Sequence, residues 1–201
     1  ALARALANKP DVMLLDEPFG SLDSSSKFNI ALDIIKVLKN TKTPTIMVSH
    51  DPQEAMRLAD RIIIMLDGHI IDQGSPKDLY SKPKHPFSTR LIGPTSSIKL
   101  KSINNFLNTP FGKIRVSPNK NKMFEVIIRP EAFSYSKNNR KAISLNIINY
   151  QYLGLLTEII IIDNKSNKNI KFLIFSNILD KLLSSNKLLF NKEWAFVFPI
   201  K

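Results

Sequence analysis

The strongest constraint on the fold of this chain is a short apolar run that ends in two adjacent carboxylates. Residues 12–15 suit a strand buried on both faces of a parallel sheet, and Asp16 and Glu17 follow directly. Open α/β sheets bind ligands at the carboxyl ends of their strands. Two carboxylates there repel each other unless a cation or a proton intervenes. The run therefore predicts a Mg²⁺ site in which one carboxylate holds the hydrated metal and the other polarises a water molecule.

A second apolar run predicts a partner strand for this site. Residues 45–48 end at Ser49-His50-Asp51. Between the two runs, apolar residues recur at helical spacing and predict a helix with one apolar face: Phe28, Ala31, Leu32, Ile35 and Leu38. A strand–helix–strand crossover makes both strands end at the same edge. We therefore expect Asp16, Glu17 and His50 to meet in one cleft. The alternatives are that the two acids cap a helix and that His50 is satisfied by backbone groups.

Residues 51–92 predict several short helices and one β-hairpin. Asp51 and Pro52 are suited to the cap and first turn of a helix. Residues 61–66 and 69–73 predict two strands joined by the turn Asp67-Gly68. Ser75-Pro76 predicts a short helix as far as Tyr80, and a further helix is expected over residues 86–92.

Charge and composition predict two domains. The formal net charge is +12, and residues 1–95 contain 12 Lys/Arg and 11 Asp/Glu, whereas residues 96–201 contain 17 and 6. The boundary is expected near residue 95, at Gly93-Pro94-Thr95-Ser96-Ser97. Short apolar runs then predict an all-β barrel or sandwich, at residues 113–116, 124–128, 142–152, 155–162, 170–175, 187–190 and 194–198. The basic charge is typical of nucleic-acid or membrane binding, but scattered lysines favour a solvated surface.

Several classes of protein are excluded or disfavoured by what the sequence lacks. The chain has no cysteine, which excludes disulfides, zinc–thiolate sites and a thiol nucleophile. Its apolar stretches are far shorter than the roughly 20 residues of a membrane helix. It opens Ala1-Leu2-Ala3-Arg4, without a Met and in helical rhythm. We expect a fragment that begins inside a helix.

Four motifs in order resemble the second half of an ABC-transporter ATP-binding subunit. Residues 1–6 resemble the helix after the signature motif of that family, and residues 14–18 (Leu-Leu-Asp-Glu-Pro) match its Walker B strand. Gly20-Ser21-Leu22-Asp23 matches its D-loop, and Ser49-His50-Asp51 matches its switch histidine. The order and the spacing are specific, and the resemblance covers residues 1 to about 92.

The resemblance implies a role for each matched residue. Asp16 would hold Mg²⁺, Glu17 would orient or deprotonate the attacking water, and His50 would contact the γ-phosphate of ATP. Ser21, Leu22 and Asp23 would lie at the interface with a second ATP-binding subunit, in a homodimer. Asp23 is also suited to a plain helix N-cap, which is compatible with that role.

The second half resembles the regulatory β-domain of some importer ATPases, which is similar to an oligonucleotide/oligosaccharide-binding (OB) barrel. The matching segments are residues 129–131 (Arg-Pro-Glu), 152–154 (Tyr-Leu-Gly) and 194–198. This branch includes sulfate, spermidine/putrescine, iron and maltose importers, and residues 87–94 are most similar to the sulfate/thiosulfate subunit. The implied partners are transmembrane permease subunits and, indirectly, a substrate-binding protein. The implied location is the cytoplasmic face of a membrane, or the stromal face if the gene is organellar.

The sequence contains no phosphate-binding Gly-x-x-x-x-Gly-Lys-Ser/Thr loop and no Leu-Ser-Gly-Gly-Gln signature. We therefore predict that this chain alone neither binds ATP tightly nor hydrolyses it. A partial sequence, a separately encoded upstream part and a decaying gene are all compatible with this absence. An importer ATPase for another substrate is an alternative. A basic OB-like module that binds nucleic acid is a second alternative, although no motif aligns its aromatic residues on one face.

Overall fold

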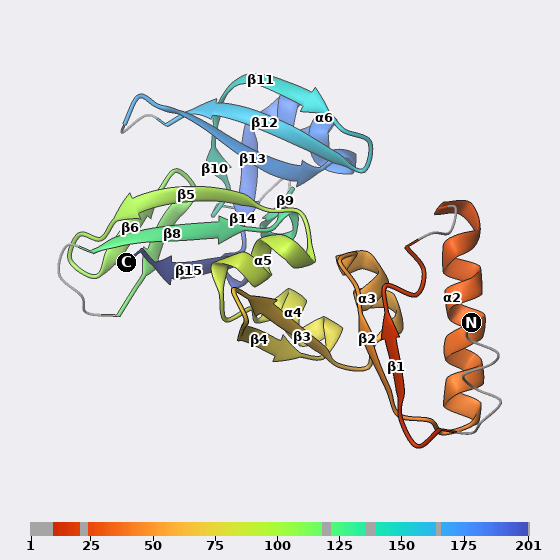
Figure 1. Ribbon diagram of the computed structural model, residues 1–201. Coiled ribbons are helices and arrows are strands. Elements are labelled where there is room, and N and C mark those ends of the chain that lie inside the picture. The colour runs from red at the N-terminus through yellow and green to blue at the C-terminus, as the bar shows by residue number, and fades with distance from the viewer. Residues whose placement is uncertain (1–9, 21–23, 118–121, 136–139, 164–165, 201) are drawn as a thin grey trace. The chain divides into compact units, whose positions relative to one another are not determined.

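A computed structural model describes residues 10–20, 24–117, 122–135, 140–163 and 166–200 (Figure 1). Contacts divide the chain into two compact units, Ala1–Leu79 and Tyr80–Lys201. The first unit combines helices with a parallel strand pair, and the second consists mainly of antiparallel strands, which agrees with the predicted α/β segment and β domain. The OB-like form of that domain stays a prediction. The expected helix at residues 1–7 and the expected interface residues Ser21, Leu22 and Asp23 lie outside the described residues.

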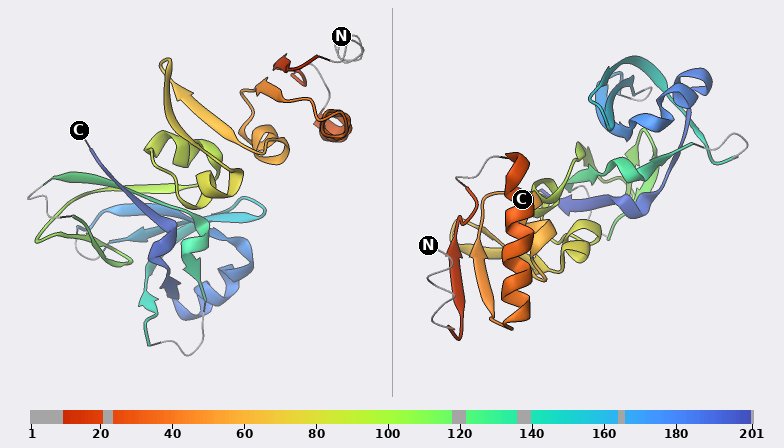
Figure 2. Two further views of the ribbon diagram at one scale, coloured as in Figure 1. Left: turned by 90° about the horizontal axis from the view of Figure 1, so that it is seen from below. Right: turned by 90° about the vertical axis from the view of Figure 1, so that its right-hand side faces the viewer.

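The first unit is built on two parallel strands. β1 (Met13–Asp16) pairs with β2 (Thr45–Val48), with Leu14 opposite Ile46 and Asp16 opposite Val48. Helix α2 (Ser24–Asn40) connects the strands and lies to one side of both (Figure 2). The predicted strand–helix–strand order is confirmed. Parallel pairing places the carboxyl ends of β1 and β2 at one edge of the sheet.

Among the described residues, helices cover one face of this strand pair. Phe19, Ala31 and Leu58 form a small core, and Met47 of β2 packs against it. Helix α2 turns Ile34 and Ile35 toward that core, so the predicted position of Leu32 on the apolar face is wrong, because Leu32 is exposed.

The expectation that residues 12–15 are buried on both faces is also wrong. Leu14 is 72% exposed and its neighbour Ile46 is 62% exposed. Strand side chains alternate between faces, and no described element covers the face opposite α2. The apolar run therefore reflects a face that is left open among the described residues.

The remaining elements of the first unit match their predictions. α3 (Pro52–Leu58) begins after Asp51, whose side chain accepts hydrogen bonds from two backbone N–H groups of the first turn. β3 (Ile62–Leu66) and β4 (His69–Gly74) form a hairpin across Asp67 and Gly68, which have φ angles of 49° and 76°. Positive φ at both positions is typical of the tight hairpin turn that Asp-Gly favours. α4 (Pro76–Ser81) follows.

The second unit consists of short antiparallel ladders around one core. Its strands are β5 (Ser96–Lys101), β6 (Phe106–Thr109), β7 (Gly112–Arg115), β8 (Met123–Ile128), β9 (Phe133–Ser134), β10 (Ile143–Ser144), β11 (Asn146–Tyr152), β12 (Leu156–Ile162), β13 (Asn169–Phe175), β14 (Lys187–Phe190) and β15 (Ala195–Pro199). Its helices are α5 (Pro86–Ile92) and α6 (Leu179–Ser185), with 3₁₀ turns at Pro130–Ala132, Ser176–Ile178 and Lys192–Trp194. Each predicted run coincides with a strand, and the sequence interpretation missed β5, β6 and β9. Phe111 contacts Phe133 and Phe172 edge-to-face within this core.

Residues 80–95 belong with the second unit because a buried arginine holds them. Arg129 is fully buried, and its Nε and Nη2 donate to the backbone carbonyls of Tyr80 (3.0 Å) and Thr89 (3.2 Å). Its guanidinium lies 3.8 Å from the centre of the Tyr80 ring. A Cβ atom at Gly93 would lie 2.8 Å from the same ring, so any other residue there would force the Tyr80 ring to move. The division between the two compact units therefore lies between residues 79 and 80, before the change in composition at residue 95. The domain boundary at residue 95 remains a prediction.

The helices that the structure describes are all too short or too polar to span a membrane.

Candidate functional site

The carboxyl ends of β1 and β2 hold Glu17 in an unusual backbone conformation. The Glu17 N–H donates to the carbonyl of Val48 (3.0 Å), which continues the parallel ladder by one residue. Glu17 then takes a φ of 46°, in the left-handed region, and its carbonyl accepts from the N–H of Gly20 (3.2 Å). A non-glycine residue in this region costs about 1–2 kcal/mol. Such strain is concentrated at functional sites in proteins.

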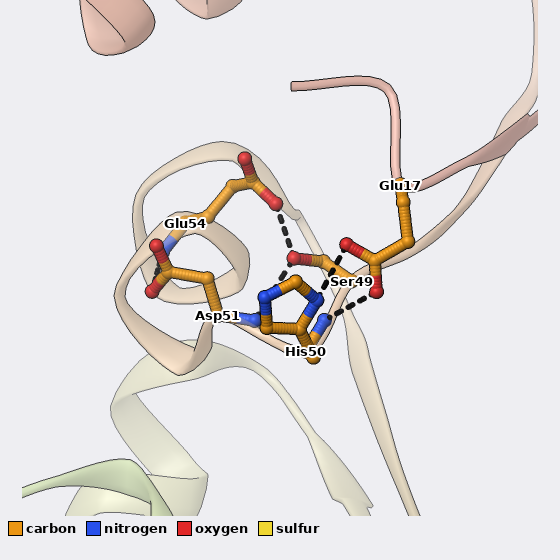
Figure 3. A network of polar contacts seen from close by, with 5 residues as sticks. All are labelled: Glu17, Ser49, His50, Asp51 and Glu54. Carbon is orange, nitrogen blue, oxygen red and sulfur yellow. Dashed lines mark hydrogen bonds and ion pairs between the residues drawn. The ribbon is translucent and has the colours of Figure 1, made fainter. Parts of the chain in front are cut away.

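Glu17 and His50 contact each other directly at this edge (Figure 3). The His50 backbone N–H donates to Oε1 of Glu17 (3.0 Å), and His50 Nδ1 lies 2.7 Å from Glu17 Oε2. The predicted meeting of these two residues is confirmed. The His50 side chain is 78% exposed, so packing does not fix its ring and these two contacts define its position.

Asp16 lies on the same edge but takes no part in the Glu17–His50 contact. Its side chain is exposed at the end of β1, and no other described residue forms an ion pair or hydrogen bond with it. Two of the three expected residues therefore come together, and the carboxylate of the third lies at the same edge without a polar contact to the described residues.

The carboxylates at this edge bear on whether it can hold Mg²⁺. Among the described residues, no group of three or more His, Cys, Asp or Glu side chains forms a metal-binding cluster. The described residues of this edge therefore do not form a site that could enclose a metal ion with protein ligands alone. Mg²⁺ in phosphoryl-transfer sites uses one or two carboxylates, water and substrate phosphates, and a single exposed carboxylate such as that of Asp16 fits this mode.

A second polar network surrounds His50, and only its Asp51 cap was predicted. Ser49 Oγ donates to Oε2 of the buried Glu54 and accepts from the N–H of Asp51 (3.1 Å). Asp51 Oδ1 accepts from the N–H groups of Gln53 (2.9 Å) and Glu54 (3.3 Å). The spacing Asp51-x-x-Glu54 follows the pattern of a helix capping box, which indicates the Asp51 cap but not the inward turn of the Glu54 side chain toward Ser49.

A cavity of about 250 Å³ lies in the second unit, away from the residues singled out by sequence. Its lining includes Thr109, Ser144, Ile161 and Asp163, and none of its lining residues belongs to the Glu17–His50 edge. Exposure, rather than a cavity, characterises the edge: the side chains of His50 and Asp16 are exposed and that of Glu17 is 38% exposed.

The chain is similar to import ATP-binding proteins for three substrates. It is 34% identical over 145 residues to the Fe(3+) ions import ATP-binding protein FbpC of Mesorhizobium japonicum, covering 72% of this chain and 40% of that protein. It is 32% identical over 168 residues to the spermidine/putrescine import ATP-binding protein PotA of Clostridioides difficile, covering 82% and 48%. It is 36% identical over 184 residues to the sulfate/thiosulfate import ATP-binding protein CysA of Mesostigma viride, covering 90% and 52%.

These matches extend over most of the chain and agree with its ordered motifs. The chain belongs to the ABC-importer ATP-binding subunits. No protein-family model matches it. The chain spans about half the length, or less, of the ABC-importer subunits that it matches. Residues 1–201 therefore correspond to a part of what those ABC-importer subunits contain, and this part includes the Glu17–His50 edge.

Proposed function

We propose that this chain forms the catalytic edge of an ABC importer's ATP-binding subunit, which hydrolyses ATP to drive transport. The observation that carries the proposal is the direct Glu17–His50 contact at the ends of two parallel strands. Glu17 is assigned to orient or deprotonate the attacking water, and His50 is assigned to donate a hydrogen bond to the γ-phosphate. Asp16 is assigned to hold Mg²⁺, which supplies positive charge to the phosphates when bound.

The phosphates of ATP need a second set of contacts that residues 1–201 do not supply. The sequence contains no Gly-x-x-x-x-Gly-Lys-Ser/Thr loop, whose backbone N–H groups and lysine hold the phosphates in this family. We propose that these groups come from polypeptide outside residues 1–201. On this proposal the isolated chain neither binds ATP tightly nor hydrolyses it. Micromolar ATP binding to residues 1–201 in calorimetry would contradict this.

We assign sulfate or thiosulfate as the transported substrate of the complex. The match to the sulfate/thiosulfate subunit covers 90% of this chain, against 82% and 72% for the spermidine/putrescine and iron subunits. This extent of matching supports the assignment, as does the resemblance of residues 87–94 to the sulfate/thiosulfate subunit. The proposed partners are a second ATP-binding subunit, facing Ser21, Leu22 and Asp23, and transmembrane permease subunits. A substrate-binding protein would act through the permease, and the location would be the cytoplasmic face of the membrane.

The catalytic assignment is tested in a chimaera. Residues 1–201 replace the matched segment of the Mesostigma viride CysA protein, and ATP hydrolysis is measured. We expect the chimaera to hydrolyse ATP. Glu17→Gln is expected to lower kcat by at least about 100-fold, because it removes the group that positions or deprotonates water. The same variant should retain ATP affinity.

Two results would contradict these assignments. Undiminished hydrolysis by Glu17→Gln would remove Glu17 from its role. Glu158→Gln, at a partly exposed acid in the second unit, serves as the matched control. For the substrate, cells that lack their own sulfate-importer ATPase should recover sulfate uptake with the chimaera. The equivalent chimaera built on the PotA protein should restore less spermidine uptake, and the reverse order would overturn the sulfate assignment.

A further inference from the structure

The position of His50 depends on its backbone, because the only described polar contact of its ring is with Glu17. The ring is mostly exposed, and its described polar contacts are with Glu17. A hydrogen bond between the His50 N–H and Glu17 forms only when the turn after β2 has one shape. Whatever fixes residues 49 and 51 therefore fixes the histidine that the proposed function uses.

Ser49 and Glu54 fix that turn from its buried side. Glu54 is only 2% exposed, although it lies in the first turn of α3, where acidic side chains usually point into solvent. Its Oε2 accepts a hydrogen bond from the Ser49 hydroxyl. Ser49 Oγ in turn accepts from the N–H of Asp51, on the other side of His50.

The network also anchors the turn to a rigid element. Asp51 caps α3 by accepting from the N–H groups of Gln53 and Glu54. Figure 3 shows the Ser49 hydroxyl between the Glu54 carboxylate and the backbone N–H of Asp51, next to His50. Ser49, the residue after β2, thus links the end of that strand to the first turn of α3 through one hydroxyl group. His50 lies between the two linked residues.

We propose that Ser49 and Glu54 are positioning residues that hold His50 against Glu17. Neither touches the reacting atoms in the proposed function, on which the catalytic meaning of this inference rests. Their effect passes through the backbone of the turn. Loss of the hydroxyl or of the carboxylate frees residues 49–51 to change shape, and His50 then leaves Glu17 while the strands and helices remain.

The inference is tested by NMR on residues 1–201, without ATP. Glu17→Ala defines the position of the His50 amide signal when its acceptor is gone. Ser49→Ala and Glu54→Gln are expected to move this signal at least half of the way toward that position, while signals from α2 stay in place. Ser166→Ala and Glu158→Gln are matched controls, because both residues form exposed polar contacts in the second unit. An unmoved His50 signal in Ser49→Ala and Glu54→Gln would overturn the inference.

A conservative variant covers the case in which Ser49→Ala fails to fold. Ser49→Thr keeps the hydroxyl and should leave the His50 signal at its wild-type position. A displaced signal in folded Ser49→Thr would count against the inference. In the active chimaera, Ser49→Ala should lower kcat about 10-fold or more with the KM for ATP changed less than about twofold, because misplacement affects the transition state more than binding. If the chimaera is inactive, the proposed function fails, and the NMR result still decides this inference.

Discussion

Glu17 has a strained backbone and also contacts His50 through its side chain. Substitutions at this position can distinguish the energetic effect of the strain from that of the contact. Its φ of 46° is unfavourable for any residue with a Cβ atom and is easily adopted by glycine. The hydrogen bonds to Val48 and Gly20 hold this conformation in place. Glycine would therefore be the more stable residue at this backbone conformation, and the chain has glutamate there instead.

We predict that Glu17→Gly is more stable than Glu17→Ala. Both variants lose the contact with His50, but only alanine retains the left-handed strain, which is worth about 1 kcal/mol. The free energy of unfolding from urea titration should be higher for Glu17→Gly by about this amount, less the entropy that glycine adds to the unfolded chain. Equal stability, or a more stable alanine variant, would show that the backbone at Glu17 is not strained.

Sequence alone predicted the Glu17–His50 meeting but not the network that supports it. The meeting follows from strand order, because two parallel strands must end at one edge. The role of Glu54 depends on whether its side chain folds back under the turn or points outward. Both arrangements suit an acid at the third position of a helix, so the spacing alone does not select one.

Helices and strands show the same difference between features that local sequence predicts and features that depend on distant contacts. The Asp67-Gly68 turn and the Asp51 cap were predictable because one local geometry demands those residue types. Strand β5 (Ser96–Lys101) was missed because its polar residues alternate with Ile98 and Leu100 inside a segment that resembles a linker. β5 exists because β8 pairs along its whole length, a contact about 30 residues away in sequence that local patterns do not report.

The contact between Tyr80 and Glu131, both in the second unit, predicts a pH dependence. The Tyr80 hydroxyl donates to Oε1 of Glu131 (2.5 Å), and burial, reinforced by this carboxylate, raises the pKa of Tyr80 from 10.0 to about 12. Folding thus favours the neutral phenol. The contribution of Tyr80 to stability is complete below about pH 10 and is lost as the pH rises through about 12.

Urea unfolding between about pH 9 and pH 12 checks this dependence against Tyr80→Phe. The stability difference between the natural chain and the variant should shrink across this range, because only the natural chain has the phenol to ionise. Lysines titrate in both proteins, so their effect cancels in the difference. A constant difference would contradict the raised pKa.

The open face of the β1–β2 pair affects the behaviour of the chain in solution. Val12, Leu14, Ile46 and Val48 are each at least half exposed and alternate along the two strands. Parallel sheets usually have both faces covered. An exposed apolar surface of this kind promotes association.

We predict that residues 1–201 self-associate through this face. The double variant Leu14→Thr, Ile46→Thr keeps strand-forming residues but removes apolar area worth about 3 kcal/mol, or roughly 100-fold in an association constant. Light scattering over a concentration series should show this decrease. Leu155→Thr, at a 78% exposed apolar position in the second unit, should associate like the natural chain. Equal association of the double variant would locate the contact elsewhere.

The buried guanidinium of Arg129 determines where this protein can be cut or recombined. Its acceptors are backbone carbonyls at Tyr80 and Thr89, which no side-chain substitution can remove but which a truncation can. A breakpoint at residue 95 would leave a desolvated positive charge without these partners, at a penalty of several kcal/mol. The transplantable module is therefore the β domain together with its leading segment from Tyr80 onward. Gene fusions that respect this junction should preserve the domain, and those that join at the change in composition should not.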